Sequence, residues 1–256
     1  MKVSLTPWAT SMGQAARLGV SLIDSLGSPA KPPADQPPPP PNVADPHAVS
    51  LAGAIESDVG IDAAWASLSA GDQRTLAAEL ARSRTPVSPR LYELALVAGK
   101  AEAAFDISQM PESTRRDLAA RASAGDPKVR QQAFERALAF VKALHDAGGV
   151  LATASGTGPD GWPTPGLGIH RELQWLVTAG LTPAEALRAA TASSSAVLGE
   201  RLAGQWRPGA PADFFAVKDD PLADLAALTD ITLIVRGGEV LDRAVLLAQA
   251  RRATRR

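Results

Sequence analysis

The sequence has no cysteine, only three histidines and one tyrosine among 256 residues, and a formal net charge of only -1. Without cysteine there is no disulfide framework, no thiolate metal site and no thiol nucleophile, so a metal would need His, Asp, Glu or a modified Lys as ligands. A charge near zero gives nucleic acid and anionic membranes no advantage over a neutral small molecule. We therefore expect neither nucleic acid nor membrane as a partner.

Long apolar runs are also missing. No segment approaches the ~20 consecutive apolar residues of a membrane span. Near the N-terminus, Pro7, Gln14 and Arg17 interrupt the apolar residues that a signal peptide would need. The composition, 45% apolar and 21% charged, is that of an ordinary globular protein. The chain as written is therefore expected in the cytoplasm.

Proline is concentrated in one segment. Residues 28–46 include the sequence KPPADQPPPPPNVADP, which has few backbone donors for helix or sheet pairing. We interpret this segment as an inserted loop or a semi-rigid spacer. A ligand for a proline-binding domain is the alternative.

The N-terminal half alternates strand and helix patterns. A short strand at 3–6, a helix at 11–18 and a strand at 20–23 are followed by a helix at 70–81. The sequence TPVSPRLYEL then suggests a strand that runs into a loop. This order predicts parallel β/α units.

The next elements carry stronger local signals. A charged helix is predicted at 111–124, and a long amphipathic helix at 129–147 ends at Gly148-Gly149. The segment VLATAS, residues 150–155, is predicted as the fourth parallel strand.

Two helices then follow a turn-rich segment. The first ends at Gly180, and the second begins with Thr182, Pro183 and Glu185, a capping box with proline at the first helical position. The remaining predictions are strands at 213–217, 231–236 and 239–241, a helix at 244–252 and a basic tail with Arg251, Arg252, Arg255 and Arg256.

The amino-acid sequences of these elements resemble those of a known family. The sequences TPGLGIHRELQWLVTAGLTPAEALRAAT and RPGAPADFFAVKDDPL resemble the C-terminal half of the amidohydrolase superfamily, in its imidazolonepropionase-like and prolidase-like branch. The resemblance implies an α/β fold: a partial TIM-type (β/α) barrel, strands five to eight, over residues 1–200 with the insertion at 28–46. A small C-terminal β-sandwich portion at 201–243 and a helix with a basic tail at 244–256 would complete the chain.

The family's chemistry depends on divalent metal, typically zinc, held at the carboxyl ends of the barrel strands. The resemblance places Ser155 where the family has a metal-binding Asp after strand eight, and serine is a poor ligand and no base at neutral pH. Asp160 would substitute only if its loop took another path, and a surface turn is the simpler interpretation. Ser25 falls at the histidine position of strand six, and Leu5 or Thr6 at that of strand five.

The three histidines are scattered. His47 lies in the proline-rich segment and His145 near the end of a helix, where both are expected to face solvent. His170 matches a family position near the substrate, so helix capping and substrate contact both remain open for it. No metal ligands and no cofactor are therefore predicted within this chain.

Three functional hypotheses follow. The first is an amidohydrolase-related hydrolase of C-N bonds other than peptide bonds that is inactive or incomplete as a single chain. The second is a non-catalytic pseudoenzyme that acts as a subunit or a small-molecule binding module, and the third is a truncated gene product. Because a half barrel leaves its outer strands unpaired, a homo-oligomer or a separately encoded N-terminal half is the expected partner.

Overall fold

A computed structural model gives the structure of the chain over residues 4–5, 12–26, 51–100, 112–155, 166–200 and 202–253. The chain divides into two compact units, Met1–Leu181 and Thr182–Arg256. Each unit is described by itself below. None of the helices in the described part of the chain is long and apolar enough to cross a membrane.

The first unit contains a parallel sheet with the order β1 (Ser4–Leu5), β2 (Leu22–Asp24) and β3 (Val87–Ser88). Leu151 extends the order through an isolated parallel bridge to Val87, in which Val87 N–H donates to Val150 and Ala152 N–H donates to Val87. Four successive strand positions therefore run in the same direction. This confirms the prediction of parallel β/α units, although the fourth strand is reduced from six residues to one bridge.

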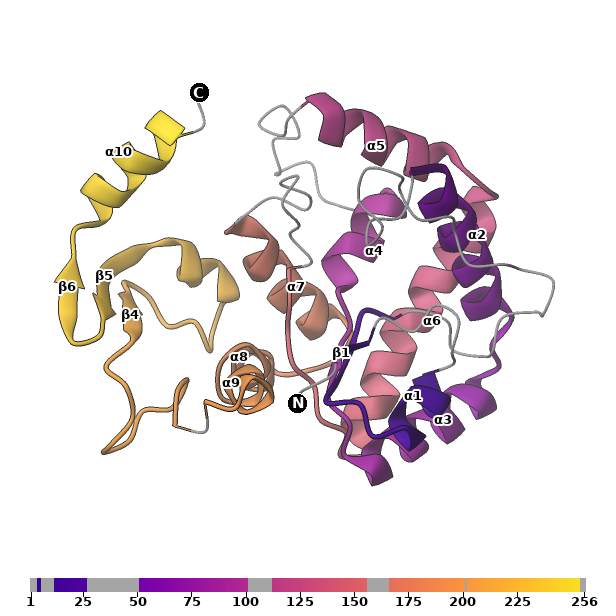
Figure 1. Cartoon of the computed structure of the whole chain (residues 1–256), viewed down its shortest axis with the longest axis horizontal. Helices are drawn as coiled ribbons and strands as arrows, with labels where there is room; N and C mark the ends of the chain where they lie inside the picture. The colour runs from indigo at the N-terminus through magenta and orange to yellow at the C-terminus, as the bar shows by residue number, and fades with distance from the viewer. Residues whose placement is uncertain are drawn as a thin grey trace. The chain divides into compact units, whose positions relative to one another are not determined.

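Helices of the first unit connect and cover these strands (Figure 1). They are α1 (Met12–Arg17), α2 (Leu51–Ser67), α3 (Ala70–Ser83), α4 (Leu91–Val97), α5 (Glu112–Ser123), α6 (Pro127–Asp146) and α7 (Leu167–Thr178). The predicted helices 11–18, 70–81, 111–124 and 129–147 are confirmed within a few residues. The sequence interpretation of a loop after β3 was wrong, because α4 forms there.

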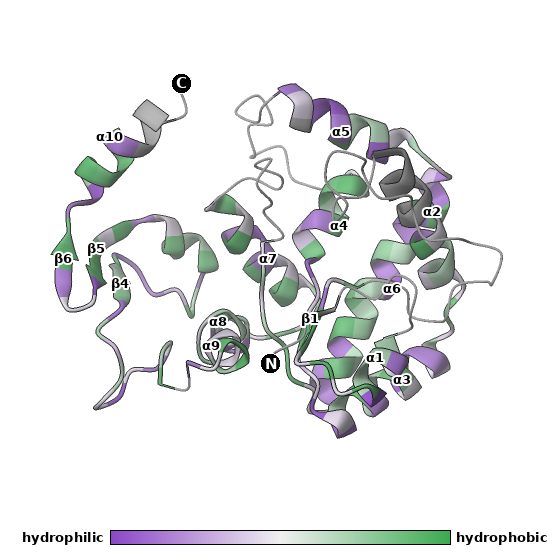
Figure 2. Cartoon of the chain, in the orientation of Figure 1, coloured by the Kyte–Doolittle hydropathy of each residue, from purple (hydrophilic) through white to green (hydrophobic). Residues whose placement is uncertain are grey.

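The long helix α6 forms the centre of this unit's packing. Its N-cap Asp126 accepts a hydrogen bond from Lys128 N–H, and Pro127 occupies the first turn, where its missing donor costs nothing. Gly148, with φ +77°, follows the C-cap and takes a left-handed conformation that suits glycine. Hydrophobic and hydrophilic residues alternate along the helix (Figure 2), and Phe140, Val141 and Leu144 on its apolar face are fully buried.

The helix α2 has no counterpart among the sequence predictions. It contacts α6 over most of its length, and Trp65 packs on Phe140 with ring centroids 5.1 Å apart. Arg130 on α6 donates a hydrogen bond to Asp62 on α2 across 2.9 Å. Contacts that are distant in sequence therefore hold this helix in place, which explains why no local pattern predicted it.

The second unit begins with the predicted capping box. Thr182 accepts from Glu185 N–H, and the Glu185 carboxylate accepts from Thr182 N–H. Its elements are α8 (Pro183–Arg188), a π-helical turn (Ala189–Ser193), α9 (Ser194–Leu198), β4 (Phe214–Val217), a 3-10 helix (Leu225–Thr229), β5 (Ile231–Arg236), β6 (Glu239–Leu241) and α10 (Arg243–Ala253).

The strands of the second unit form an antiparallel sheet with the order β4-β5-β6. All three strand predictions are confirmed, and Gly237 and Gly238 make the turn between β5 and β6 at positive φ. The mixed α/β class is thus confirmed, while each sheet contains only three strands.

Candidate functional site

The carboxyl ends of the parallel strands meet at one edge of the first unit, the place where α/β barrels build their sites. Asp24 ends β2 opposite Ser88, which ends β3, and Ser25 N–H donates to the Ser88 carbonyl across 2.7 Å. Ser155 follows the Leu151 bridge by four residues. This strand-end edge is thus built largely from hydroxyl groups.

Two residues at this edge have an unusual backbone. Ser25 has φ +81° and Arg90, the residue before α4, has φ +53°. For non-glycine residues such conformations cost on the order of 1–3 kcal/mol and persist only where the surroundings enforce them. The turns after β2 and β3 are therefore held in place by their hydrogen bonds and ion pairs.

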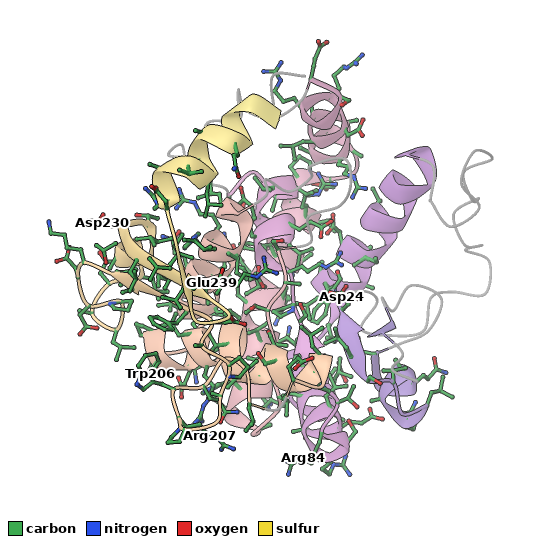
Figure 3. All side chains as sticks on the ribbon, turned by 60° about the vertical axis from the view of Figure 1, so that its left-hand side comes forward. Asp24, Arg84, Trp206, Arg207, Asp230 and Glu239 are labelled. Atoms are coloured by element: carbon green, nitrogen blue, oxygen red, sulfur yellow. The ribbon has the colours of Figure 1, made fainter. Side chains whose placement is uncertain are left out.

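The strongest polar interaction at the edge is an ion pair between neighbouring strand ends. Arg90 donates through Nε and an Nη atom to the two oxygens of Asp24, at 3.0 and 2.5 Å, and its guanidinium lies 3.6 Å from Glu93. Burial disfavours the charged guanidinium, but the carboxylates of Glu93 and Asp24 outweigh burial, so the pKa of Arg90 is raised. Asp24, labelled in Figure 3, thus has both oxygens engaged by a permanent cation.

The structure brings Ser155 next to the start of α7. A Cβ atom added at Gly168 would come within 2.9 Å of the Ser155 Cβ, so only glycine allows this approach without a shift. His170 lies two residues further along the helix and is half-buried, and its Nδ1 is buried without a hydrogen-bond partner. Burial, with a smaller effect of the nearby Arg171, lowers the pKa of His170, so its imidazole is neutral at pH 7.

Sequence reasoning missed the most buried ionisable group of the region. Glu172 is 0% exposed, and its Oε2 accepts a hydrogen bond of 2.7 Å from the Tyr92 N–H at the start of α4. Among the described residues, its Oε1 has no hydrogen-bond partner within normal hydrogen-bond geometry. Burial raises the pKa of Glu172 to about 7, against the opposing effect of the Tyr92 and Leu91 backbone N–H groups. The available signal was a carboxylate four residues before Leu176, on the apolar face of an amphipathic helix.

The structure describes only some of the other predicted positions. Leu5 is the last residue of β1 and stands at the carboxyl end of that strand, whereas Asp160, His47 and Thr6 lie outside the described residues. His145 lies near the end of α6, with its Nδ1 3.4 Å from Asp146 Oδ1. Within the described ranges, no group of three or more His, Cys, Asp or Glu side chains is arranged to hold a metal ion.

The residues at the strand ends do not fit the divalent metal that the resemblance implies. Hydroxyl side chains stand at Ser25 and Ser155, and neutral serine is a weak ligand for such ions. The neighbouring carboxylate of Asp24 is neutralised by Arg90 rather than free to coordinate. No catalytic step through a metal can be derived from these residues.

Comparison with known proteins shows which proteins this chain resembles. Residues 136–241 match the amidohydrolase family. Over 100 residues the chain is 36% identical to an ochratoxinase from Aspergillus niger, a match that covers 37% of this chain and 20% of that protein. The chain therefore spans only about a fifth of the length of the curated relative that it matches.

Solved structures extend the likeness of the fold to nearly the whole chain. A Xaa-Pro dipeptidase is 16% identical with a TM-score of 0.51, over 94% of this chain and 54% of that one. A candidate prolidase from Bifidobacterium longum is 20% identical with a TM-score of 0.50, over 94% of this chain and 63% of that one. At these identities the likeness to the two solved structures is one of fold alone. The similarity of this chain to the amidohydrolase family therefore rests on residues 136–241.

Proposed function

We propose that this chain is an amidohydrolase-related protein, by descent a hydrolase of C-N bonds other than peptide bonds, that does not hydrolyse such bonds as a single chain. The observation that supports this most directly is the Asp24–Arg90 ion pair at the strand ends, flanked by Ser25. A guanidinium neutralises the carboxylate that precedes Ser25, and the resemblance places the family's metal ligand and proton-shuttling Asp at Ser25 and Ser155.

The proposal includes an architecture. The four parallel strand positions at β1, β2, β3 and Leu151 correspond to strands five to eight of a TIM-type barrel, and the β4-β5-β6 sheet to part of a β-sandwich. The unbroken parallel order and the helices between the strands support the first correspondence. In the described part of the chain, β1 pairs with β2 alone, which leaves one side of it for a further strand.

Metal analysis and hydrolysis assays test the proposal. The purified chain is expected to hold far less than one equivalent of zinc and to leave N-acyl amino acids and Xaa-Pro dipeptides at the buffer rate of hydrolysis. One equivalent of zinc together with hydrolysis that a chelator abolishes would refute it. A loss of that hydrolysis in Ser155→Ala but not in Ser123→Ala, an exposed serine of α5, would then assign Ser155 to the site.

The alternative is a non-catalytic pseudoenzyme that acts as a subunit. The unpaired side of β1 supports it, because open sheet edges pair with other chains, either a second copy or a separately encoded N-terminal half. Light scattering coupled to size exclusion distinguishes the two possibilities. A mass twice that of the chain indicates the homodimer, and a monomeric mass that rises only when an N-terminal half is added indicates the second arrangement.

A further inference from the structure

The first unit also contains a cavity, in addition to the strand-end edge described above. It has a volume of about 80 Å³ and lies beside Ser25 and Leu26, among residues of α2, α4, α5 and α6. Most of its wall is apolar. Trp65, Leu94, Val97 and Phe134 contribute the larger side chains.

One side of the cavity is charged and rigid. Arg130 is 5% exposed, and its guanidinium donates to Asp62 at 2.9 Å and to the carbonyls of Ala122 and Ala124 at 2.8 and 2.6 Å. These three interactions fix the guanidinium in one position. Asp62, by contrast, receives one hydrogen bond from Arg130 and lies partly open, with 17% of its side chain exposed.

Asp62 therefore retains capacity to accept hydrogen bonds. A carboxylate has two oxygens and about four acceptor positions. Burial raises the pKa of Asp62, and the hydrogen bond and charge of Arg130 offset this only in part. A ligand group that donates to Asp62 would replace the hydration that burial removes.

The remaining charges of the wall select against an ionic ligand. Two carboxylates, Asp62 and Glu93, and two guanidiniums, Arg121 and Arg130, line the cavity. Asp62 is paired with Arg130, Glu93 lies 3.6 Å from Arg90 outside the wall, and Arg121 has an interaction partner of its own. Because the charges of the wall balance, an added ion would lose its hydration without gaining a free counter-charge.

We propose that this cavity binds a small neutral molecule with a ring-sized apolar body and one hydrogen-bond donor, the donor directed at Asp62 and the ring placed among Trp65, Phe134 and Val97. An apolar engineered cavity of roughly 150 Å³ binds benzene. The present cavity is smaller but partly open to solvent, so a single bound ring would leave one edge exposed. The cavity adjoins the strand-end edge at Ser25, but binding of this ligand needs no hydrolytic chemistry and does not depend on the proposed function.

Calorimetric titration of the full chain with phenol, anisole and benzoate tests the site. These probes share one ring, but only phenol is both neutral and a donor. Phenol is expected to bind at least tenfold more tightly than anisole or benzoate, a difference of about 1.4 kcal/mol, which a hydrogen bond to a charged group can supply. Equal affinities for all three, or no binding of phenol to the folded chain, would overturn the proposal.

Two substitutions locate the binding. Ala137→Leu adds three carbon atoms to the wall of the cavity, whereas Ala139→Leu makes the same change at an exposed position of the same helix. Phenol affinity is expected to fall at least tenfold in the first and to stay unchanged in the second. If Ala137→Leu fails to fold, Ala98→Leu fills the cavity from α4. Unchanged phenol affinity in a folded cavity-filling variant contradicts the site, while zinc-dependent hydrolysis would contradict only the proposed function.

Discussion

At the scale of single residues, the strand-end edge of the first unit combines hydroxyl groups with one ion pair. Ser25 and Ser155 provide hydroxyls, and Arg90 supplies a fixed positive charge to Asp24. The same region contains Glu172, a buried carboxylate that joins α7 to the first turn of α4. The Asp24–Arg90 ion pair and the hydrogen bond to Glu172 therefore help to hold the helices against the strand ends.

Glu172 makes the stability of the first unit depend on pH. Its pKa is about 7 in the folded chain and 4.5 in its ordinary state, so the folded chain binds the proton more tightly. The stabilisation that proton binding by Glu172 gives the folded chain is present below pH 4.5 and is lost as the pH rises through 7. The free energy of unfolding is expected to fall by on the order of 3 kcal/mol across that interval, measured by urea denaturation at a series of pH values.

Glu172→Gln is the matched control for this pH dependence. It keeps an oxygen that accepts from Tyr92 N–H but cannot ionise. The variant is expected to show a flatter pH profile and to exceed the original chain in stability above pH 7. An unchanged slope in the variant would show that another group titrates.

At the scale of elements, local sequence patterns predicted those features that interactions between nearby residues stabilise. The capping box of Thr182 and Glu185 could be predicted because the two residues lie three positions apart. By contrast, α2 depends on α6, which lies far along the sequence, and the strands β1 and β3 contain only two residues each. Tertiary contacts such as Glu172 to Tyr92 likewise have no signature in a single segment.

The attachment of α2 to α6 predicts a large effect of Arg130. Arg130→Met removes the partner of Asp62 and the donors to Ala122 and Ala124 while keeping much of the apolar stem. Leaving a buried carboxylate unpaired costs roughly 3–5 kcal/mol. We expect a loss of this order in the free energy of unfolding, measured in urea.

An exposed ion pair of the same helix serves as comparison. Lys142 and Asp146 pair at the surface, where their interaction is screened by solvent. Lys142→Met is expected to change the midpoint of unfolding little. If both variants lose the same stability, the Asp62–Arg130 pair does not hold α2 in place.

At the scale of the whole molecule, the chain is made of two units that are stabilised differently. The first has a core rich in large buried side chains, including Tyr92, Phe140 and Leu144. In the described part of the second, the buried apolar residues are fewer: Ala186, Ala189, Leu225, Leu228 and Val235. Since stability follows buried apolar area, the second unit is expected to be the weaker one.

This difference predicts two separable unfolding transitions. Trp65 and Trp175 lie in the first unit, whereas Trp206 of the second is already 84% exposed and its emission can change little on unfolding. Circular dichroism should therefore detect an early transition in urea that tryptophan emission does not follow. Val235→Ala is expected to destabilise only the unit that unfolds in the early transition, and Leu144→Ala only the unit that unfolds in the later one. Each substitution should lower the free energy of unfolding of its unit by roughly 1–4 kcal/mol, the cost of truncating a buried side chain. Coincident transitions by both probes in all three proteins would mean that the two units unfold as one cooperative molecule.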